Sequence, residues 1–214
     1  MKKIILIGGG GHCKVVIESI LSQKHYSIAG IIDLQKKAGK KTLGVPVIGE
    51  DSELSSFFKK GIRNCFIALG SAGKPGLRIK LYGLGKKIGF KFPNIIHPAA
   101  NLSAFAILGE GNYVGPLAVI NAGARLGNNC IINTASIVEH DCLISDFVHL
   151  APAVALSGGV SVGAGTHVGI GSVVIQNVKI GKNSIIGAGS IVTGDIESNV
   201  IAFGNPAKKI RKNA

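Results

Sequence analysis

The sequence of 214 residues contains no tryptophan, and aromatic residues make up only 5% of it. Proteins that bind single-stranded nucleic acid stack the bases on aromatic side chains, so this shortage argues against such a role. The formal net charge is nevertheless +13, because 24 Lys and Arg residues face only 11 Asp and Glu residues. The basic residues are scattered along the chain, which suits small phosphorylated ligands or simple solubility. We therefore expect no nucleic-acid partner.

Cysteine and long apolar segments are also scarce. The four cysteines, Cys13, Cys65, Cys130 and Cys142, form no CxxC pair. Zinc and redox motifs usually contain such pairs, so we predict buried, reduced thiols, no metal site and a cytoplasmic location. The apolar run Ile4–Ile7 is too short for a signal peptide, and no stretch is long enough to span a membrane. No membrane insertion is expected.

The most informative feature of the chain is a repeat with a period of six. An aliphatic side chain recurs at every sixth position, a small residue stands two places before it from position 106 to position 190, and glycine often follows it directly. A period of six fits neither an amphipathic helix nor an alternating strand, and it is typical of a parallel β-helix. The aliphatic positions are Ile96, Leu102, Leu108, Val114, Ile120, Leu126, Ile132, Val138, Ile144, Leu150, Leu156, Val162, Val168, Val174, Ile180, Ile186 and Val192.

Three such hexads make one triangular coil, so residues three hexads apart should stack at the strand spacing of about 4.8 Å. The aliphatic residue fills the prism, the small residue lies at a crowded corner, and glycine is expected to supply backbone freedom at the turn. A similarity to known hexapeptide-repeat proteins implies a left-handed winding. Such a thin prism exposes flat faces, which favours association into a homotrimer.

The first ninety residues predict a different architecture. A buried strand at Ile4–Ile7 leads into four glycines and His12, and a helix, a second strand at Ile28–Ile32 and Asp33 follow. This order is typical of a Rossmann-like nucleotide-binding unit, in which glycines let a diphosphate approach the helix N-terminus. The GxGxxG motif is incomplete, because Cys13 occupies its last glycine position. A merely tight turn between strand and helix therefore remains an alternative.

A third strand at Cys65–Leu69 ends at Gly70, and Leu77–Lys87 is expected to form a helix. This region is too short for a full dinucleotide fold, so one nucleotide is the better match. We predict three parts: residues 1–91 as a Rossmann-like nucleotide-binding domain, 92–204 as a left-handed β-helix domain, and 205–214 as a basic C-terminal tail. The fold class is thus α/β followed by all-β.

The clearest polar interruption of the repeat is Glu139-His140-Asp141. A carboxylate beside a histidine orients the ring and stabilises its protonated form, which is the usual arrangement of a general base. Gly158 lies one coil later and should leave space and an N–H beside the imidazole. His149 lies half a coil away, so it could meet His140 only between subunits, and His167 should stack on His149. Plain surface histidines, or a zinc site built by all three in a trimer, are the alternatives.

The chain resembles the bacterial sugar acyltransferases of the sialic-acid O-acetyltransferase (NeuD/PglD-like) family. The resemblance rests on the glycine turn with His12, on Asp33, on the strand end at 67–70, on the hexads and on the closing residues 204–208. The tract 133–149 is its most specific part. The chain departs from the family's pattern in Asp141, where relatives often have Glu, in Leu34 after Asp33, and in a longer glycine-rich loop at 71–76.

The resemblance implies an acetyl-CoA-dependent acetyltransferase that is a homotrimer and reacts in the cleft between neighbouring β-helices. It assigns the general base to His140 and its polarising acid to Asp141. Acetyl-CoA would contact His149, Gly158, Ile170 and Ala188. The nucleotide-sugar acceptor would contact Gly10, Gly11, His12, Asp33, Gly70 and Asn133. Of these residues, Asp33 would lie at the uracil.

The activity implied is N-acetylation of a nucleotide-linked amino sugar of the UDP-4-amino-4,6-dideoxy type, by direct transfer. Direct transfer is favoured because Cys142, the nearest thiol to His140, should point into a packed corner. O-acetylation of sialic acid or a related nonulosonate is one alternative. A hexapeptide-repeat protein that binds nucleotide sugars without turnover is another.

Overall fold

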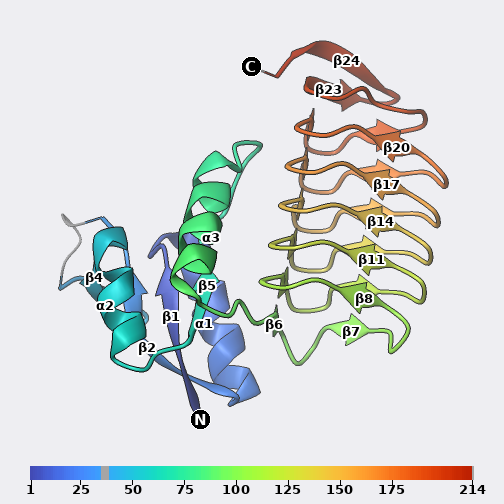
Figure 1. The fold of residues 1–214 in the computed structure, drawn as a ribbon. Helices are drawn as coiled ribbons and strands as arrows, with labels where there is room; N and C mark the ends of the chain where they lie inside the picture. The colour runs from blue at the N-terminus through green and yellow to red at the C-terminus, as the bar shows by residue number, and fades with distance from the viewer. Residues whose placement is uncertain (35–38, 214) are drawn as a thin grey trace. The chain divides into compact units, whose positions relative to one another are not determined.

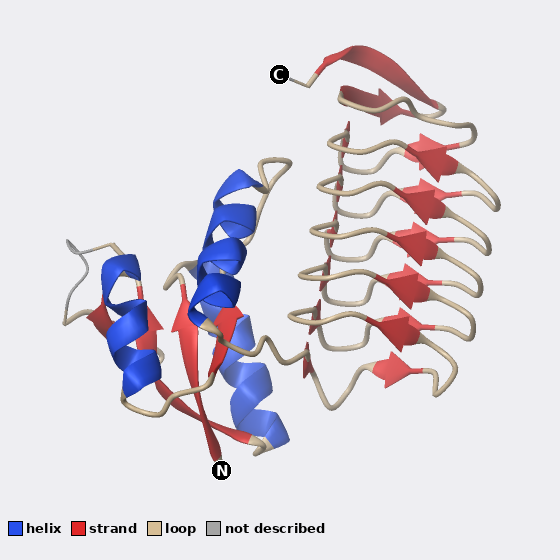
Figure 2. Cartoon of the chain, in the orientation of Figure 1, coloured by secondary structure: helices blue, strands red, loops and turns tan. Residues whose placement is uncertain are grey.

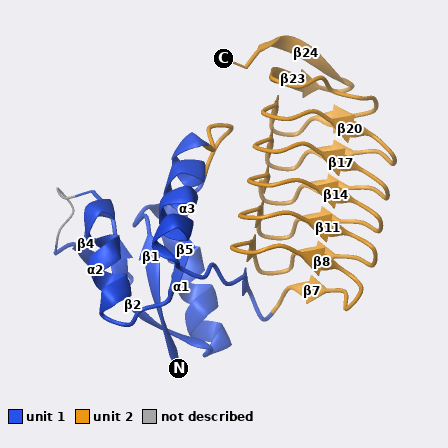
Figure 3. Ribbon diagram, in the orientation of Figure 1, with its two compact units in different colours: residues 1–70, 76–98 blue, residues 71–75, 99–214 orange. Residues whose placement is uncertain are grey.

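The computed structural model describes residues 1–34 and 39–213. The chain divides into two compact units, one of residues 1–70 and 76–98 and one of residues 71–75 and 99–214 (Figure 3). The predicted boundary near residue 92 thus differs from the division in the structure, which follows Pro98. The loop Ser71–Pro75 belongs to the second unit although it lies between two elements of the first.

The first unit contains a sheet with the strand order β3-β4-β2-β1-β5 among its described residues (Figure 1). Strand β1 is parallel to both β2 and β5, and only β3 runs antiparallel to its neighbour β4. The elements are β1 (Lys2–Ile7), α1 (Gly11–Gln23), β2 (Tyr26–Ile32), β3 (Lys41–Thr42), β4 (Val45–Gly49), the 3-10 helix η2 (Asp51–Glu53), α2 (Leu54–Lys59), β5 (Asn64–Ile67), α3 (Gly76–Ile88) and β6 (Ile95–Ile96).

Strand β1 is the centre of this unit because Ile4, Ile5, Leu6 and Ile7 are all buried. A continuous apolar run of this kind suits a parallel strand that is covered on both faces. The strand order changes direction beside β1, since the chain moves outward through β2 and β4 and then crosses to β5. Ligands of open α/β sheets bind at the carboxyl ends of strands at such a switch point.

The second unit is a β-helix of two-residue strands joined by short loops, followed by the longer strands β23 and β24 (Figure 2). It has three faces, which we name after one outward residue: the Val119 face, order β22-β19-β16-β13-β10-β7; the Arg125 face, order β20-β17-β14-β11-β8; and the His149 face, order β24-β23-β21-β18-β15-β12-β9. The strands are β7 (Asn101–Leu102), β8 (Ile107–Leu108), β9 (Tyr113–Val114), β10 (Val119–Ile120), β11 (Arg125–Leu126), β12 (Ile131–Ile132), β13 (Ile137–Val138), β14 (Leu143–Ile144), β15 (His149–Leu150), β16 (Ala155–Leu156), β17 (Ser161–Val162), β18 (His167–Val168), β19 (Val173–Val174), β20 (Lys179–Ile180), β21 (Ile185–Ile186), β22 (Ile191–Val192), β23 (Val200–Gly204) and β24 (Ala207–Lys212).

The register confirms the predicted coil of three hexads, as Val119 pairs with Ile137 and His149 with His167. The predicted inward residues from Val114 to Val192 are buried, whereas Ile96, Leu102 and Leu108 at the start of the repeat are half-buried. The predicted fold class, a small Rossmann-like domain followed by a left-handed parallel β-helix, is confirmed.

The small residues at the corners are buried and often polar for a clear reason. Ser136 Oγ donates to the carbonyl of Ala151 at 2.9 Å, and Thr166 Oγ1 donates to that of Gly181 at 2.7 Å. Cys142 Sγ makes the same contact to the carbonyl of Ser157 at 3.2 Å. Each side chain therefore donates a hydrogen bond to a backbone carbonyl on the next coil, which satisfies its own hydroxyl or thiol inside the packed corner.

The expectation that the glycine after each aliphatic residue supplies the turn conformation was wrong. Positive φ occurs three places after the aliphatic position, for example at Gly123, Asp141 and Gly159. A Cβ at Gly163, directly after the aliphatic Val162, would instead lie 2.5 Å from the backbone nitrogen of Lys182. Glycine is needed there because the backbones of neighbouring coils approach closely.

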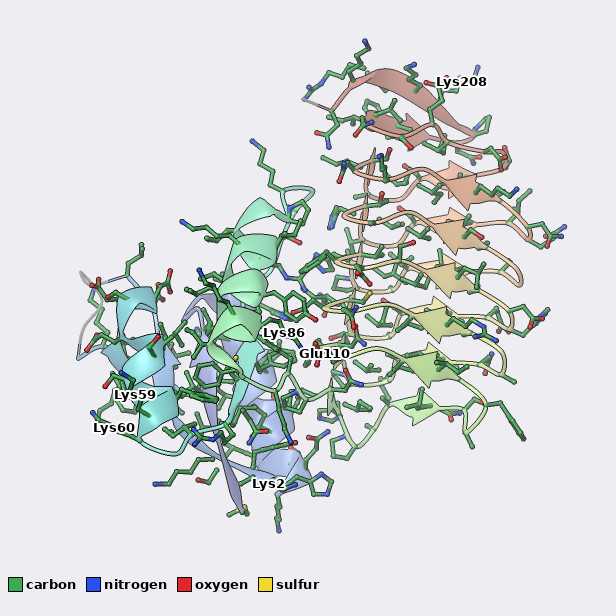
Figure 4. All side chains as sticks on the ribbon, in the orientation of Figure 1. Lys2, Lys59, Lys60, Lys86, Glu110 and Lys208 are labelled. Carbon is green, nitrogen blue, oxygen red and sulfur yellow. The ribbon has the colours of Figure 1, made fainter. Side chains whose placement is uncertain are left out.

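The residues predicted as a basic tail, 205–214, include β24, which pairs antiparallel with β23; Ala214 lies outside the described residues. Figure 4 shows Lys208 on this last strand, at the opposite end of the β-helix from β7. No helix in the described part of the chain is long and apolar enough to cross a membrane.

Candidate active site

The first unit has a pocket of about 480 Å³ at the carboxyl ends of its central strands. Ile7 and Gly8 from the end of β1, Ile32 and Asp33 from the end of β2, and Leu69 after β5 line it. The pocket thus lies where the strand order changes direction, as the Rossmann-like pattern predicts. Its other lining residues are Leu34, Glu50, Asp51, Ser52, Leu77 and Leu81.

Sequence reasoning found Asp33 in this pocket but missed the polar segment Glu50–Ser52. That segment follows β4, a strand that we did not predict from the sequence and whose apolar pattern is interrupted by Pro46. Burial raises the pKa of Asp51, with Lys80 opposing the shift and Asp33 and Glu50 adding to it. A signal was present in the two acids directly after Gly49, at the position that Asp33 occupies after β2.

The carboxylate of Asp33 holds the glycine turn. Its Oδ2 accepts the backbone N–H of Gly9 at 2.8 Å, and its Oδ1 accepts that of Leu34 at 2.8 Å. A Cβ at Gly9 would lie 2.9 Å from Oδ2, so glycine is required for this approach. Asp33 therefore fixes the turn, whatever it contacts in a ligand.

Removing the charge of Asp33 should loosen this turn. In Asp33→Asn the amide can no longer serve both N–H groups, so opening at Gly9 should become easier by about 1–2 kcal/mol, the cost of a charge-assisted hydrogen bond at a half-buried site. Amide hydrogen exchange at Gly9 should then be about tenfold faster. Asp51→Asn is the control, because Asp51 lines the same pocket but no hydrogen bond of its carboxylate appears in the described residues. Equal exchange rates in both variants would contradict this role of Asp33.

Gly10 and Gly11 are glycines that the fold itself does not require. Gly10 is the N-cap of α1, and a Cβ at Gly10 or Gly11 would meet no described atom within 4 Å. Neither residue has positive φ. Open space at a helix N-terminus, where the helix dipole favours negative charge, suits a phosphate. His12 lies in the first turn of α1, and a Cβ at Gly70 would be 3.6 Å from its Cβ, so these two predicted residues are neighbours.

In the second unit, His140 and Asp141 form the predicted pair. His140 Nδ1 lies 2.9 Å from Asp141 Oδ2, and both side chains are largely exposed. A carboxylate can only accept, so Nδ1 carries the proton and Nε2 of the neutral ring is left as the basic nitrogen. Asp141 has a φ of 60°, and a Cβ at Gly123 one coil earlier would lie 2.4 Å from its Oδ1. Gly123 therefore makes room for the carboxylate.

Gly158 stacks on His140, as the coil of three hexads predicts. A Cβ at Gly158 would lie 2.5 Å from both Cε1 and Nε2 of the imidazole, so the ring is held against bare backbone. The N–H of Gly159 donates to the carbonyl of His140 at 2.9 Å. Within residues 1–34 and 39–213, by contrast, the N–H of Gly158 has no hydrogen-bond acceptor. A free donor thus lies beside the basic nitrogen.

His149 lies on a different face from His140. Its Nδ1 is 2.6 Å from the carbonyl oxygen of Ser71, and its Nε2 is 3.4 Å from Nδ2 of Asn133. The His149 and His167 rings stack edge to face with centroids 4.8 Å apart, which confirms the predicted stacking. Burial lowers the pKa of His167, so this ring is neutral at neutral pH.

The remaining predicted residues lie at another corner. Ile170 and Ala188 follow the His149 face, one coil apart, and the side chain of Ile170 is 55% exposed. One strand of the Val119 face separates this corner from that of His140 and Gly158 in each coil. A single chain thus does not bring together the residues expected to hold acetyl-CoA.

The cysteines are buried, and none of the four is in a disulfide. Burial raises the pKa of Cys142 to about 11 and that of Cys13 to about 12. Thiols in this state are poor nucleophiles. In the described residues, no group of three or more His, Cys, Asp or Glu side chains could hold a metal ion.

Comparison with known proteins places this fold and site in a class. A model of the PglD N-terminal domain matches residues 3–82. A histidine mutant of perosamine N-acetyltransferase from Caulobacter crescentus, in complex with CoA and GDP-perosamine, is 41% identical over 98% of this chain and 97% of its own, with a TM-score of 0.93. The acetyltransferase domain of PglB from Neisseria gonorrhoeae, in complex with acetyl coenzyme A, is 35% identical over 98% of this chain and 99% of its own, with a TM-score of 0.90. WeeI from Acinetobacter baumannii is 25% identical over 98% of this chain and 100% of its own, with a TM-score of 0.87.

A Rossmann-like unit joined to a hexapeptide β-helix thus defines the class as a sugar acyltransferase. The chain belongs to the NeuD/PglD-like family of sugar acetyltransferases. The predicted family and enzyme class are confirmed, and acetyl-CoA as co-substrate agrees with the complexes of the perosamine and PglB enzymes.

Proposed function

We propose that this enzyme transfers the acetyl group of acetyl-CoA to the amine of a nucleotide-linked amino sugar. The observation that carries the proposal is the group formed by His140, Asp141 and the N–H of Gly158. A base whose tautomer is fixed by an acid stands beside an N–H donor that has no other acceptor in the described residues. Acyl transfer to an amine needs these two functions.

In the proposed reaction, Nε2 of His140 takes a proton from the acceptor amine as its nitrogen attacks the thioester carbonyl. The N–H of Gly158 donates to the oxyanion that forms, and the C–S bond then breaks to release the CoA thiolate, which takes the proton from the His140 imidazolium and restores the neutral base. Asp141 holds Nδ1–H and stabilises the imidazolium. An oxyanion donor of this kind contributes about 3 kcal/mol to lowering the barrier. Burial of Cys142 argues against an acyl-cysteine intermediate.

The pocket of the first unit is the proposed nucleotide site. The apolar residues Ile7, Leu69 and Leu77 suit a base, and the open turn at Gly10 and Gly11 suits a diphosphate. The sequence favoured a UDP-linked sugar, whereas the perosamine enzyme binds GDP-perosamine. Both nucleotides therefore belong in the test.

Homotrimer formation completes the proposed site, because the His140 corner and the corner of Ile170 and Ala188 are separated in one chain. From β10 to β22 the outward residues of the Val119 face are aliphatic: Ile137 and Val173 are 37% and 41% exposed, and Val119, Ala155 and Ile191 continue the row. An apolar face of this kind is typical of a subunit interface. A cytoplasmic location, where acetyl-CoA and nucleotide sugars are made, fits the same function.

An acceptor panel tests the proposal. CoA thiol release from acetyl-CoA should be fast with a GDP- or UDP-linked 4-amino-4,6-dideoxy sugar and at least about a hundredfold slower with the same nucleotide linked to the unaminated sugar, because an uncharged amine is a far better nucleophile than a hydroxyl group. Free and CMP-linked sialic acid form the third arm. Faster release with sialic acid would overturn the proposal in favour of O-acetylation.

A further inference from the structure

The loop Ser71–Pro75, which the proposed reaction does not use, packs on the His149 face. A Cβ at Gly73 would lie 2.2 Å from Cδ1 of Ile185, so only glycine allows this contact. Gly73 also has a φ of 74° and is buried. At the loop's end, a Cβ at Gly165 would be 3.1 Å from Cγ of Pro75. Two separate contacts thus hold the loop against the β-helix.

This packing places the backbone carbonyl of Ser71 beside the imidazole of His149. The oxygen of Ser71 lies 2.6 Å from Nδ1 of the imidazole. A carbonyl oxygen can only accept, so the proton of the neutral ring is on Nδ1 and the lone pair is on Nε2.

Asn133 gives independent support for this tautomer. Its Oδ1 accepts the N–H of Thr134 at 2.9 Å, which fixes the orientation of the amide. Its Nδ2 therefore faces Nε2 of His149, at 3.4 Å. An amide nitrogen is a donor, and it can approach Nε2 only where that atom carries no proton. The two neighbours of the ring agree.

We propose that the loop Ser71–Pro75 is a positioning element that holds His149 as the Nδ1–H tautomer, so that Nε2 can accept a hydrogen bond from an amide N–H of the pantetheine arm of CoA in place of the long contact, 3.4 Å, that it makes with Asn133 Nδ2. The part about CoA rests on the proposed function. A thioester oxygen is an acceptor, and this tautomer offers it no proton at Nε2. The CoA group that docks on His149 must therefore be a donor, and the pantetheine arm has two amide N–H groups. His167 supports the ring from the next coil.

The tautomer can be measured without turnover. In a protein labelled with ¹⁵N-histidine, two-bond ¹H–¹⁵N correlations at neutral pH should show a protonated Nδ1 and an unprotonated Nε2 for His149. His149→Gln assigns the resonances. An Nε2–H tautomer in the parent protein would overturn the proposal, whether or not the enzyme acetylates any acceptor tried.

Displacing the loop tests its role. In Gly73→Ala, the new methyl group collides with Ile185, and the Ser71 contact should be lost. We expect a mixed or Nε2–H tautomer and a Kd for CoA raised about tenfold, the equivalent of one lost hydrogen bond. Ile185→Ala should restore part of the Nδ1–H tautomer and of the affinity in the double variant, because it removes the colliding atoms but leaves the strain of an alanine at a φ of 74°. Gly61→Ala is the matched control, since Gly61 also has a positive φ, of 93°, and a Cβ there would meet no described atom within 4 Å.

The outcomes separate the two proposals. An unchanged tautomer and an unchanged Kd in Gly73→Ala would overturn the inference, and so would a shifted tautomer with unchanged CoA affinity. Failure of the whole acceptor panel, with the tautomer and the CoA shift as expected, would overturn the proposed reaction but support this role of the loop.

Discussion

Replacing His140 by alanine should lower kcat for transfer to the best acceptor by about 10²–10⁴-fold, the usual contribution of a general base. The KM for acetyl-CoA should change little, because the exposed ring makes its one side-chain hydrogen bond to Asp141 in the described structure. Steady-state measurement of CoA release checks both values. The stability of the fold should not change, because no core contact is removed.

His25→Ala is the control for this substitution, since His25 is an exposed histidine at the end of α1. It should retain the parental kcat. Were His140→Ala to turn over as fast as His25→Ala, the amine would need no protein base, and the assignment of His140 would be wrong.

Gly158→Ala is expected to lower kcat by about 10²–10³-fold, the range found when an oxyanion donor is disturbed. The new Cβ would lie 2.5 Å from Cε1 and Nε2 of His140, so the ring must move. Because the ring is exposed, it can rotate outward at little cost to the stability of the fold. It then loses its contact with Asp141 and its position beside the N–H of residue 158. The backbone itself tolerates alanine, as Gly158 does not have positive φ.

Gly194→Ala is a closely matched control. Gly194 lies in the same column two coils later, also lacks positive φ, and a Cβ there would meet no described atom within 4 Å. Circular dichroism and kcat of this variant should equal those of the parent. If Gly158→Ala also keeps the parental kcat, catalysis does not depend on the imidazole of His140 lying against the backbone of residue 158, and the proposed site is wrong.

The structure changes the reading of several predicted residues. Asp33 was expected to contact the base, but both carboxylate oxygens accept backbone N–H groups that hold the glycine turn. Asn133 was expected at the acceptor, and its amide faces His149. In both cases the hydrogen bonds of the predicted residue are made with neighbours that the sequence does not place.

The segment Glu50–Ser52 and the contact of the loop Ser71–Pro75 with His149 were not predictable from the chain alone. To place Glu50–Ser52 at the pocket, one must know where β4 lies in the sheet. Local sequence patterns do not predict a strand order in which the chain extends to both sides of β1. The second joins residues 78 positions apart through an irregular loop that has no period.

The sequence by itself determined the β-helix, its register and the place of Gly158 over His140. A strict repeat with a period of six buries its aliphatic side chains only if the chain winds as a β-helix with three hexads in each coil. Residues three hexads apart then stack on one another. Only the tertiary structure decided what the irregular segments do: the acids around the pocket, the hydrogen bonds by which Asp33 holds the glycine turn, and the tautomer of His149. Hydrogen bonds are directional and short, so a residue's partners depend on where non-repeating loops are fixed by packing, and no spacing in the sequence encodes that.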